Sequence, residues 1–217
     1  MMSNPFRAHT RFVQAQEAAR MGGSARHASG YDQMLLQLAE DRRRFKGVQS
    51  TVKKAQLKLE VLPKYAAWIN GVITADTDRQ DDVLMFLMVW RIDAGDFAGG
   101  LQIAAHAIKH GWVLPQALGR RNVQTVVAEE LADQAEAAQR MKAEFPADVL
   151  LQALSLTDAL DMPDQSRARL HKAIAAVISE SRPAAALNHY TFALQLDPRC
   201  GVKKDKERLE RQLRNSH

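Results

Sequence analysis

The sequence predicts an all-α protein of 217 residues, for three reasons. No stretch alternates apolar and polar residues for long enough to indicate a half-buried strand. Aromatic residues make up only 6% of the chain while alanine is plentiful, a composition that favours helix over sheet. Apolar residues also recur at helical and heptad spacings between recognisable helix caps and breakers. We therefore expect helices packed on helices throughout.

Composition excludes several classes of protein. One cysteine cannot form an intrachain disulfide, no apolar run reaches the roughly 18 to 20 residues of a membrane span, and the N-terminus lacks the apolar stretch of a signal peptide. We therefore expect a cytosolic protein that does not enter a membrane. Residues 1–64 carry a net charge of +7, residues 65–198 of −6 and residues 199–217 of +4. Basic ends around an acidic middle favour contact with a polyanion, and solvated helix faces are the alternative.

Three regions are expected along the chain. Residues 1–30 are polar and basic, so we expect a flexible arm there. Residues 31–112 are interpreted as an oligomerisation and DNA-binding helical region. Pro115 and Gly119 then mark a linker, and residues 123–217 form a C-terminal helical domain.

A single long heptad-patterned helix is expected over residues 31–62, between a capping box at Ser29 and Asp32 and the breaker Pro63. Its second seam is interrupted by Asp41. Because an aspartate weakens an intrachain core, we expect the seam to contact another subunit, with intrachain packing as the alternative. The residues expected at this oligomerisation contact are Leu38, Phe45, Val48, Val52 and Leu59.

The densest basic stretch of the chain lies on the same expected helix, mostly off the seam. Lysine and arginine side chains that neutralise phosphates release counterions, so this stretch is the candidate DNA-binding site. A solvated helix face is the alternative. The candidate DNA-binding residues are Arg42, Arg43, Arg44, Lys46, Lys53, Lys54 and Lys58.

Shorter helices are expected after Pro63. Pro63 itself is expected to start one that ends at Asn70-Gly71, and Thr77 with Gln80 is expected to cap a buried central helix. Two segments, residues 95–104 and 182–198, resemble the second helix of a tetratricopeptide hairpin, so we expect helical hairpins of this kind. The other helices are expected at residues 97–110, 123–145, 146–160, 165–179, 183–196 and from about 199 to 213.

Neither histidines nor carboxylates predict a catalytic or metal site. His106 and His110 share one helix face, but no third ligand is evident. A cluster of aspartates is better explained by the positive end of a helix dipole than by magnesium for phosphodiester cleavage. The cluster comprises Asp76, Asp78, Asp81 and Asp82.

Other residues with reactive or stacking side chains are also expected to be structural. The three tryptophans, Trp68, Trp90 and Trp112, are expected in the core, with base stacking as the alternative. Cys200 has no His-Asn partner of the kind that activates a nucleophile, and the chain has no phosphate-binding glycine loop. No catalytic residue, metal or cofactor is therefore predicted.

Several segments together resemble the small terminase subunit of P-two-like tailed phages. They include Tyr31-Asp32-Gln33-Met34-Leu35, Trp68-Ile69-Asn70-Gly71-Val72, Trp90-Arg91-Ile92-Asp93-Ala94-Gly95-Asp96 and Asp161-Met162-Pro163-Asp164. The resemblance implies a ring-like homo-oligomer in the host cytoplasm that recognises the cohesive-end packaging site of double-stranded viral DNA. It would deliver this DNA to the large terminase subunit, which carries the ATPase. Because the family is sometimes labelled an endonuclease subunit, a metal-dependent endonuclease is the alternative function.

Overall fold

A computed structural model describes residues 30–215, and these residues form helices without any strand. The all-α prediction is confirmed for this part of the chain. The expected arm over residues 1–30 lies, apart from Gly30, outside the described residues. The chain divides between Arg120 and Arg121 into two compact units. No helix among the described residues is long and apolar enough to cross a membrane.

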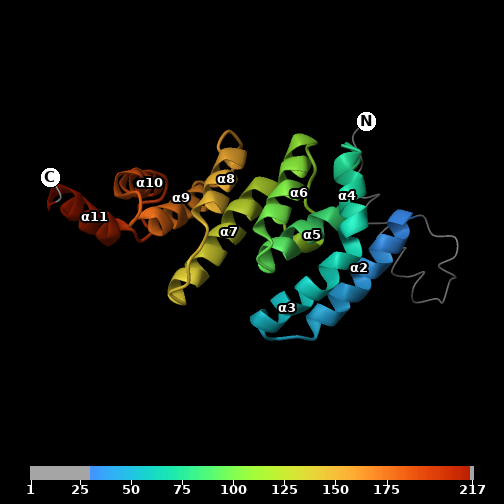
Figure 1. Cartoon of the computed structure of the whole chain (residues 1–217). Coiled ribbons are helices and arrows are strands. Elements are labelled where there is room, and N and C mark those ends of the chain that lie inside the picture. The colour runs from blue at the N-terminus through green and yellow to red at the C-terminus, as the bar shows by residue number, and fades with distance from the viewer. Residues whose placement is uncertain (1–29, 216–217) are drawn as a thin grey trace. The chain divides into compact units, whose positions relative to one another are not determined.

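The first unit is built around one buried helix (Figure 1). Its elements are α2 (Gly30–Lys46), α3 (Thr51–Val61), the 3-10 turn η2 (Leu62–Tyr65), α4 (Ala66–Thr74), α5 (Asp82–Asp93), α6 (Phe97–Lys109) and the 3-10 turn η3 (Gln116–Leu118). Helix α5 packs against α2, α3, η2 and α6, and its residues from Val83 to Met88 are all buried. It is the central helix that its apolar sequence predicts. The ring of Trp90 on α5 meets Phe45 edge-on, with the ring centroids 4.8 Å apart.

The prediction of one unbroken helix over residues 31–62 is wrong. The chain reverses at residues 47–50, and α3 returns beside α2 (Figure 1). The reason is local: Gly47 is a poor helix former, and the side chain of Ser50 caps a new helix by accepting a hydrogen bond from the backbone N–H of Lys53 at 3.2 Å. A heptad pattern that crosses such a break does not indicate one rod.

Two other helix boundaries in this unit differ from expectation. Helix α4 runs through Asn70-Gly71 to Thr74. Helix α5 begins at Asp82 with Asp81 as its N-cap, whose carboxylate accepts a hydrogen bond from the N–H of Leu84 at 2.9 Å. Thr77 does not cap it, because its hydroxyl accepts a hydrogen bond from the N–H of Arg79 within the preceding loop.

The second unit is a helical array in which α9 packs against α7, α8 and α10. Its helices are α7 (Val123–Arg140), α8 (Ala147–Thr157), α9 (Asp164–Ile178), α10 (Pro183–Leu196) and α11 (Lys203–Asn215). Helix α7 ends five residues before the expected residue 145. The pairs α5–α6 and α9–α10 lie where hairpins were expected. Their likeness to tetratricopeptide hairpins stays a prediction.

Candidate nucleic-acid interface

The turn between α2 and α3 is flanked by four cationic side chains that make no ion pair with any residue in 30–215. Arg43 and Lys46 lie in the last turn of α2, and Lys53 and Lys54 in the first turn of α3. All are exposed except Lys54, which is half-buried. Four positive charges therefore flank one four-residue turn. We call these four residues the turn cations.

The helix dipoles stabilise the two turn cations on α2 and destabilise the two on α3. Cations in the last turn of a helix face its negative end and are stabilised there, so Arg43 and Lys46 have a structural reason for their positions. Lys53 and Lys54 instead lie at the positive end of α3, whose first turn contains no acidic residue. Cations at that end cost stability, which the fold alone does not explain.

The other three candidate DNA-binding residues contact the protein itself. The guanidinium of Arg42 lies 4.3 Å from the centroid of the Phe86 ring, and burial lowers the pKa of Arg42. Arg44 lies 3.3 Å from a carboxylate oxygen of Asp41. We call Arg42, Arg44 and Lys58 the inner cations.

Lys58, the third inner cation, links α3 to the central helix. Its ammonium forms an ion pair with Asp93 of α5, and both side chains are largely shielded from solvent. Removing this charge therefore changes packing as well as the surface potential.

Asp41 is the centre of a buried charge network. Its side chain is 2% exposed and accepts a hydrogen bond from the hydroxyl of Tyr65 at 2.9 Å. Its other oxygen lies 3.3 Å from Arg44 and 3.6 Å from the ammonium of Lys64. Burial and this hydrogen bond to Asp41 raise the pKa of Tyr65. The aspartate that interrupts the heptad seam is thus satisfied inside its own chain, and the reason for expecting another subunit there is removed.

The five residues expected at an oligomer contact lie in two environments. Leu38 and Phe45 belong to the core of the first unit, with 0% and 7% of their surface exposed, and Val48 is half-buried. Val52 and Leu59, one heptad apart on α3, are 70% and 49% exposed. Of the five residues, only these two are exposed large apolar side chains.

The aspartates of the α4–α5 loop do not converge on one site. Asp81 caps α5 and accepts a hydrogen bond from the indole N–H of Trp68 at 2.8 Å. Asp82 accepts a hydrogen bond from the side-chain amide of Gln80 at 3.0 Å. Burial raises the pKa of both carboxyl groups. Asp76 instead meets the end of α6.

The tryptophans and the cysteine lie mostly as expected. Trp90 and Trp112 are each 5% exposed, as expected for core residues. Trp68 is half-buried and stacks on Tyr31 with ring centroids 6.0 Å apart. Cys200 is half-buried in the turn between α10 and α11.

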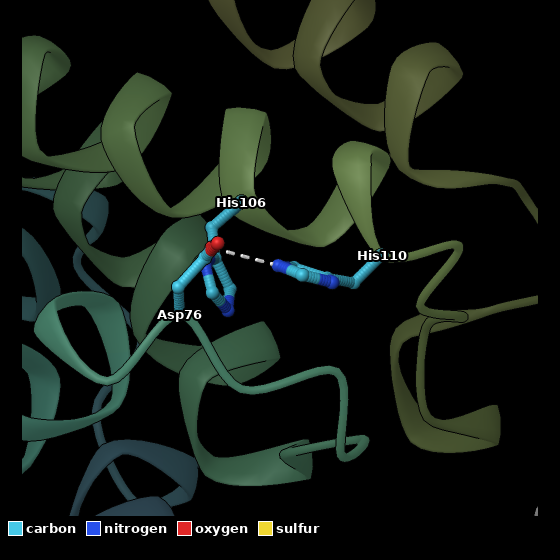
Figure 2. Close-up of side chains that lie close together, drawn as sticks. All are labelled: Asp76, His106 and His110. Carbon is cyan, nitrogen blue, oxygen red and sulfur yellow. Dashed lines mark hydrogen bonds and ion pairs between the residues drawn. The ribbon is translucent and has the colours of Figure 1, made fainter.

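The structure supplies the third ligand-type side chain that the sequence did not show beside His106 and His110. Asp76 reaches both imidazoles from the α4–α5 loop (Figure 2). One of its oxygens lies 2.9 Å from Nε2 of His110 and 3.6 Å from Nδ1 of His106. Asp76 lies 30 residues before His106 in the sequence, so the spacing along the chain does not indicate that their side chains are close. The geometry is that of a small polar cluster at the C-terminal end of α6.

The class of the protein follows from its relatives. The family model described as phage small terminase subunit matches residues 35–165, and the chain belongs to that family. It is a small terminase subunit involved in phage DNA packaging.

A relative among curated proteins is similar over nearly the whole chain. The protein named "Terminase, endonuclease subunit" of Escherichia phage P2 is 41% identical over 215 residues, which cover 98% of this chain and 87% of the relative. No solved structure matches the chain. The resemblance found in the sequence is thereby confirmed at the level of the family.

Proposed function

We propose that this small terminase subunit is an oligomeric DNA-binding protein that recognises the packaging site of double-stranded viral DNA. It then recruits or stimulates the large ATPase and nuclease subunit. Membership of the small terminase family supports DNA and a large subunit as partners in general. The large subunit supplies the nucleotide chemistry, so this chain needs no cofactor for binding DNA.

The observation that carries the proposal is the position of Lys53 and Lys54 in the first turn of α3. Positive side chains there cost stability, and a bound phosphate reverses the sign of that cost. The N–H groups and dipole of the same helix end favour an anion as well. Together with Arg43 and Lys46, these lysines offer four cations to the DNA backbone. The inner cations are already engaged within the protein.

Oligomer formation multiplies this charge. Several copies, each with a weak phosphate contact, bind one duplex with high avidity when their geometry permits simultaneous contact. We place the subunit contact on the exposed α3 face that carries Val52 and Leu59, and we propose a ring. This assignment replaces the long seam, because Leu38 and Phe45 are enclosed in the core of one protomer.

Light scattering tests the oligomer contact. The full chain should have a mass of several protomers, and a double substitution Val52→Asp with Leu59→Asp should lower that mass to one protomer. The matched control, Val113→Asp with Met141→Asp, also removes two exposed apolar side chains and should leave the mass unchanged. A monomeric wild-type chain at micromolar concentration contradicts the oligomer.

DNA binding by the lone chain tests the central part of the proposal. The affinity for a duplex with the cohesive-end site should fall linearly on a logarithmic salt scale, by a slope of about 0.9 for each phosphate contact. Filter binding or fluorescence anisotropy measures this slope. A chain that binds no duplex at low salt, or binds with an affinity independent of salt, overturns the proposal.

The printed name of the phage P2 relative favours a second function, a metal-dependent endonuclease that cuts at cohesive-end sites. The purified chain with magnesium and a cohesive-end duplex, but without the large subunit, tests it directly. Strand cleavage that EDTA abolishes supports the endonuclease. Intact duplex after prolonged incubation excludes this function for the lone chain.

A further inference from the structure

The cluster at the C-terminal end of α6 places three metal-binding groups at one point (Figure 2). His106 and His110 are one helical turn apart, and Asp76 comes from the loop that follows α4. The three ligand atoms all lie within 4.8 Å of one another. A tetrahedral zinc ion with bonds of about 2.0 to 2.2 Å separates its ligands by about 3.4 Å. The distances of 2.9 and 3.6 Å from Asp76 to the two histidines lie on either side of that value.

The imidazole of His106 is held in the orientation that a metal ligand needs. Its Nε2 lies 3.1 Å from the backbone carbonyl oxygen of Thr77 and donates a hydrogen bond to it, which leaves the lone pair on Nδ1 facing Asp76. Such a bond fixes the tautomer of a ligating histidine in metal sites. The indole of Trp112 packs edge-on against the same ring, with centroids 4.9 Å apart. His106 is therefore constrained by groups other than the candidate ligands.

The carboxylate of Asp76 is oriented in the same way. Its Oδ2 accepts a hydrogen bond from the ammonium of Lys109 at 2.5 Å, and its Oδ1 faces the histidines. Hydrogen bonds from Lys109 and His110 lower the pKa of Asp76 to about 2, so the group is ionised at neutral pH. One oxygen is thus held by a lysine while the other is directed at two imidazoles.

The backbone of Asp76 is strained in a way that places this carboxylate. Its φ is +47°, in the left-handed region that L-residues rarely adopt. A residue kept in this region carries backbone strain, and such residues cluster at ligand sites. A glycine would relieve the strain but would remove the carboxylate. The loop keeps the side chain and the strained backbone.

We propose that Asp76, His106 and His110 bind one divalent transition-metal ion of the zinc class. Two imidazole nitrogens and one carboxylate oxygen suit zinc and its neighbours, whereas magnesium and calcium prefer oxygen ligands alone. The ion takes the place of the proton between His110 and Asp76, and the negative end of the α6 dipole favours its charge. Asp76 is 53% exposed, so solvent completes the coordination.

The bound ion ties the α4–α5 loop to the end of α6. Both segments belong to the first unit, so the ion stabilises that unit alone. This proposal concerns metal binding and goes beyond the proposed DNA-binding function, since it holds whether or not the chain cuts DNA.

Cobalt and zinc titrations of the full chain, made without a polyhistidine tag and stripped with a chelator, test the site. We expect one Co²⁺ per chain, with the visible absorption of a low-coordinate cobalt centre, and displacement of that ion by Zn²⁺. Elemental analysis by mass spectrometry measures the stoichiometry. No visible band and no retained metal at micromolar concentration overturn the proposal and leave the three side chains as an ion-pair cluster.

Substitutions assign the ion to these residues. His110→Gln should weaken cobalt binding by more than the roughly tenfold that loss of an outer-shell partner of a ligand already causes. Asp76→Gly also removes a ligand but relieves the strained φ, so this variant keeps its fold and should lose the rise in melting temperature that Zn²⁺ gives the wild type. His189→Ala in the second unit is the control and should bind normally. Binding that survives both first-unit substitutions but disappears in the control places the ion elsewhere and overturns the proposal.

Discussion

The inner and turn cations lie on the same two helices, α2 and α3, yet their charges have different roles. Arg42, Arg44 and Lys58 contact Phe86, Asp41 and Asp93 inside the first unit. The turn cations form no ion pair within residues 30–215, and all but Lys54 are exposed. Removal of an inner cation should therefore destabilise the fold, while removal of a lysine from the start of α3 should stabilise it. The number of positive charges in this stretch of sequence does not show which cations stabilise the fold and which destabilise it.

Three consecutive arginines show that neighbouring cations can have different roles. Successive side chains on an α-helix point about 100° apart, so Arg42, Arg43 and Arg44 cannot face one partner. Arg42 meets the ring of Phe86, and Arg44, although exposed, meets Asp41. Arg43 is exposed and has no ion-pair partner within residues 30–215. Only one member of the run belongs to the proposed DNA surface.

The largest effect is expected when the buried anion of the inner group is removed. Asp41→Ala leaves the hydroxyl of Tyr65 without its acceptor in a site that is 0% exposed, and it releases Arg44 and Lys64. We expect a loss of about 3 kcal/mol in the free energy of unfolding. Urea unfolding followed by tryptophan fluorescence measures it, because all three tryptophans lie in the first unit. Glu40→Ala, at the exposed neighbouring position, is the control, and equal losses in the two variants would contradict the network.

A second buried group, in the other unit, should make stability depend on pH, because burial favours its neutral form. Nδ1 of His171 lies 2.8 Å from Nδ1 of His189, and burial, with the positive charges of His189 and Arg167, lowers the pKa of His171 to about 4. The unfolded chain binds a proton near pH 6.5, before the folded chain does, so stability falls as the pH drops from 6.5 towards 4.

The expected loss from His171 over this range is about 2 kcal/mol. Thermal unfolding by circular dichroism at several pH values measures it. His171→Gln should flatten the part of the pH dependence that lies between pH 6.5 and 4. A variant with the same pH profile as the wild type would show that other groups control acid stability.

Arg42→Met should lower stability by about 1 kcal/mol, because it removes the cation from the Phe86 ring while keeping an apolar stem. Arg43→Met, at the next position, should leave stability within about 0.5 kcal/mol of the wild type. The same fluorescence measurement compares them. Equal effects would remove the distinction between inner and turn cations.

The smallest effect has the opposite sign. Lys53→Gln with Lys54→Gln should raise stability by about 0.5 kcal/mol, since both changes remove a positive charge from the positive end of α3. DNA affinity should fall in the same variant. A double variant that is less stable than the wild type would mean that these lysines serve the fold.

Most of the fold follows from local sequence signals. Asp96 and Asn122 directly precede α6 and α7 and cap them by accepting hydrogen bonds from the backbone N–H of the third residue of each helix, a pattern typical of these residue types. The apolar run from Val83 onwards also predicts the buried helix α5 correctly. These signals involve residues only three or four positions apart, so they can be recognised in the sequence alone.

Two of the three errors involve contacts between distant residues. The third is local: the heptad spacing continues across the break at Gly47 and Ser50, although Leu38 and Phe45 of α2 are buried while Val52 and Leu59 of α3 are exposed. The structural role of Asp41 depends on its partner Tyr65, which is 24 residues away along the chain. The cluster of Asp76 with His106 and His110 likewise joins residues that sequence spacing does not connect.

One comparison of DNA binding tests the central claim most directly. A quadruple variant with Arg43, Lys46, Lys53 and Lys54 all changed to Gln is measured beside a control with Arg199, Lys142, Lys203 and Lys204 all changed to Gln, which removes the same number of charges from the second unit. We predict that the first variant loses up to about three units of the logarithmic salt slope, and that the control keeps the wild-type slope. Equal slopes in the two variants would show that only net charge matters and would contradict a DNA surface at the α2–α3 turn.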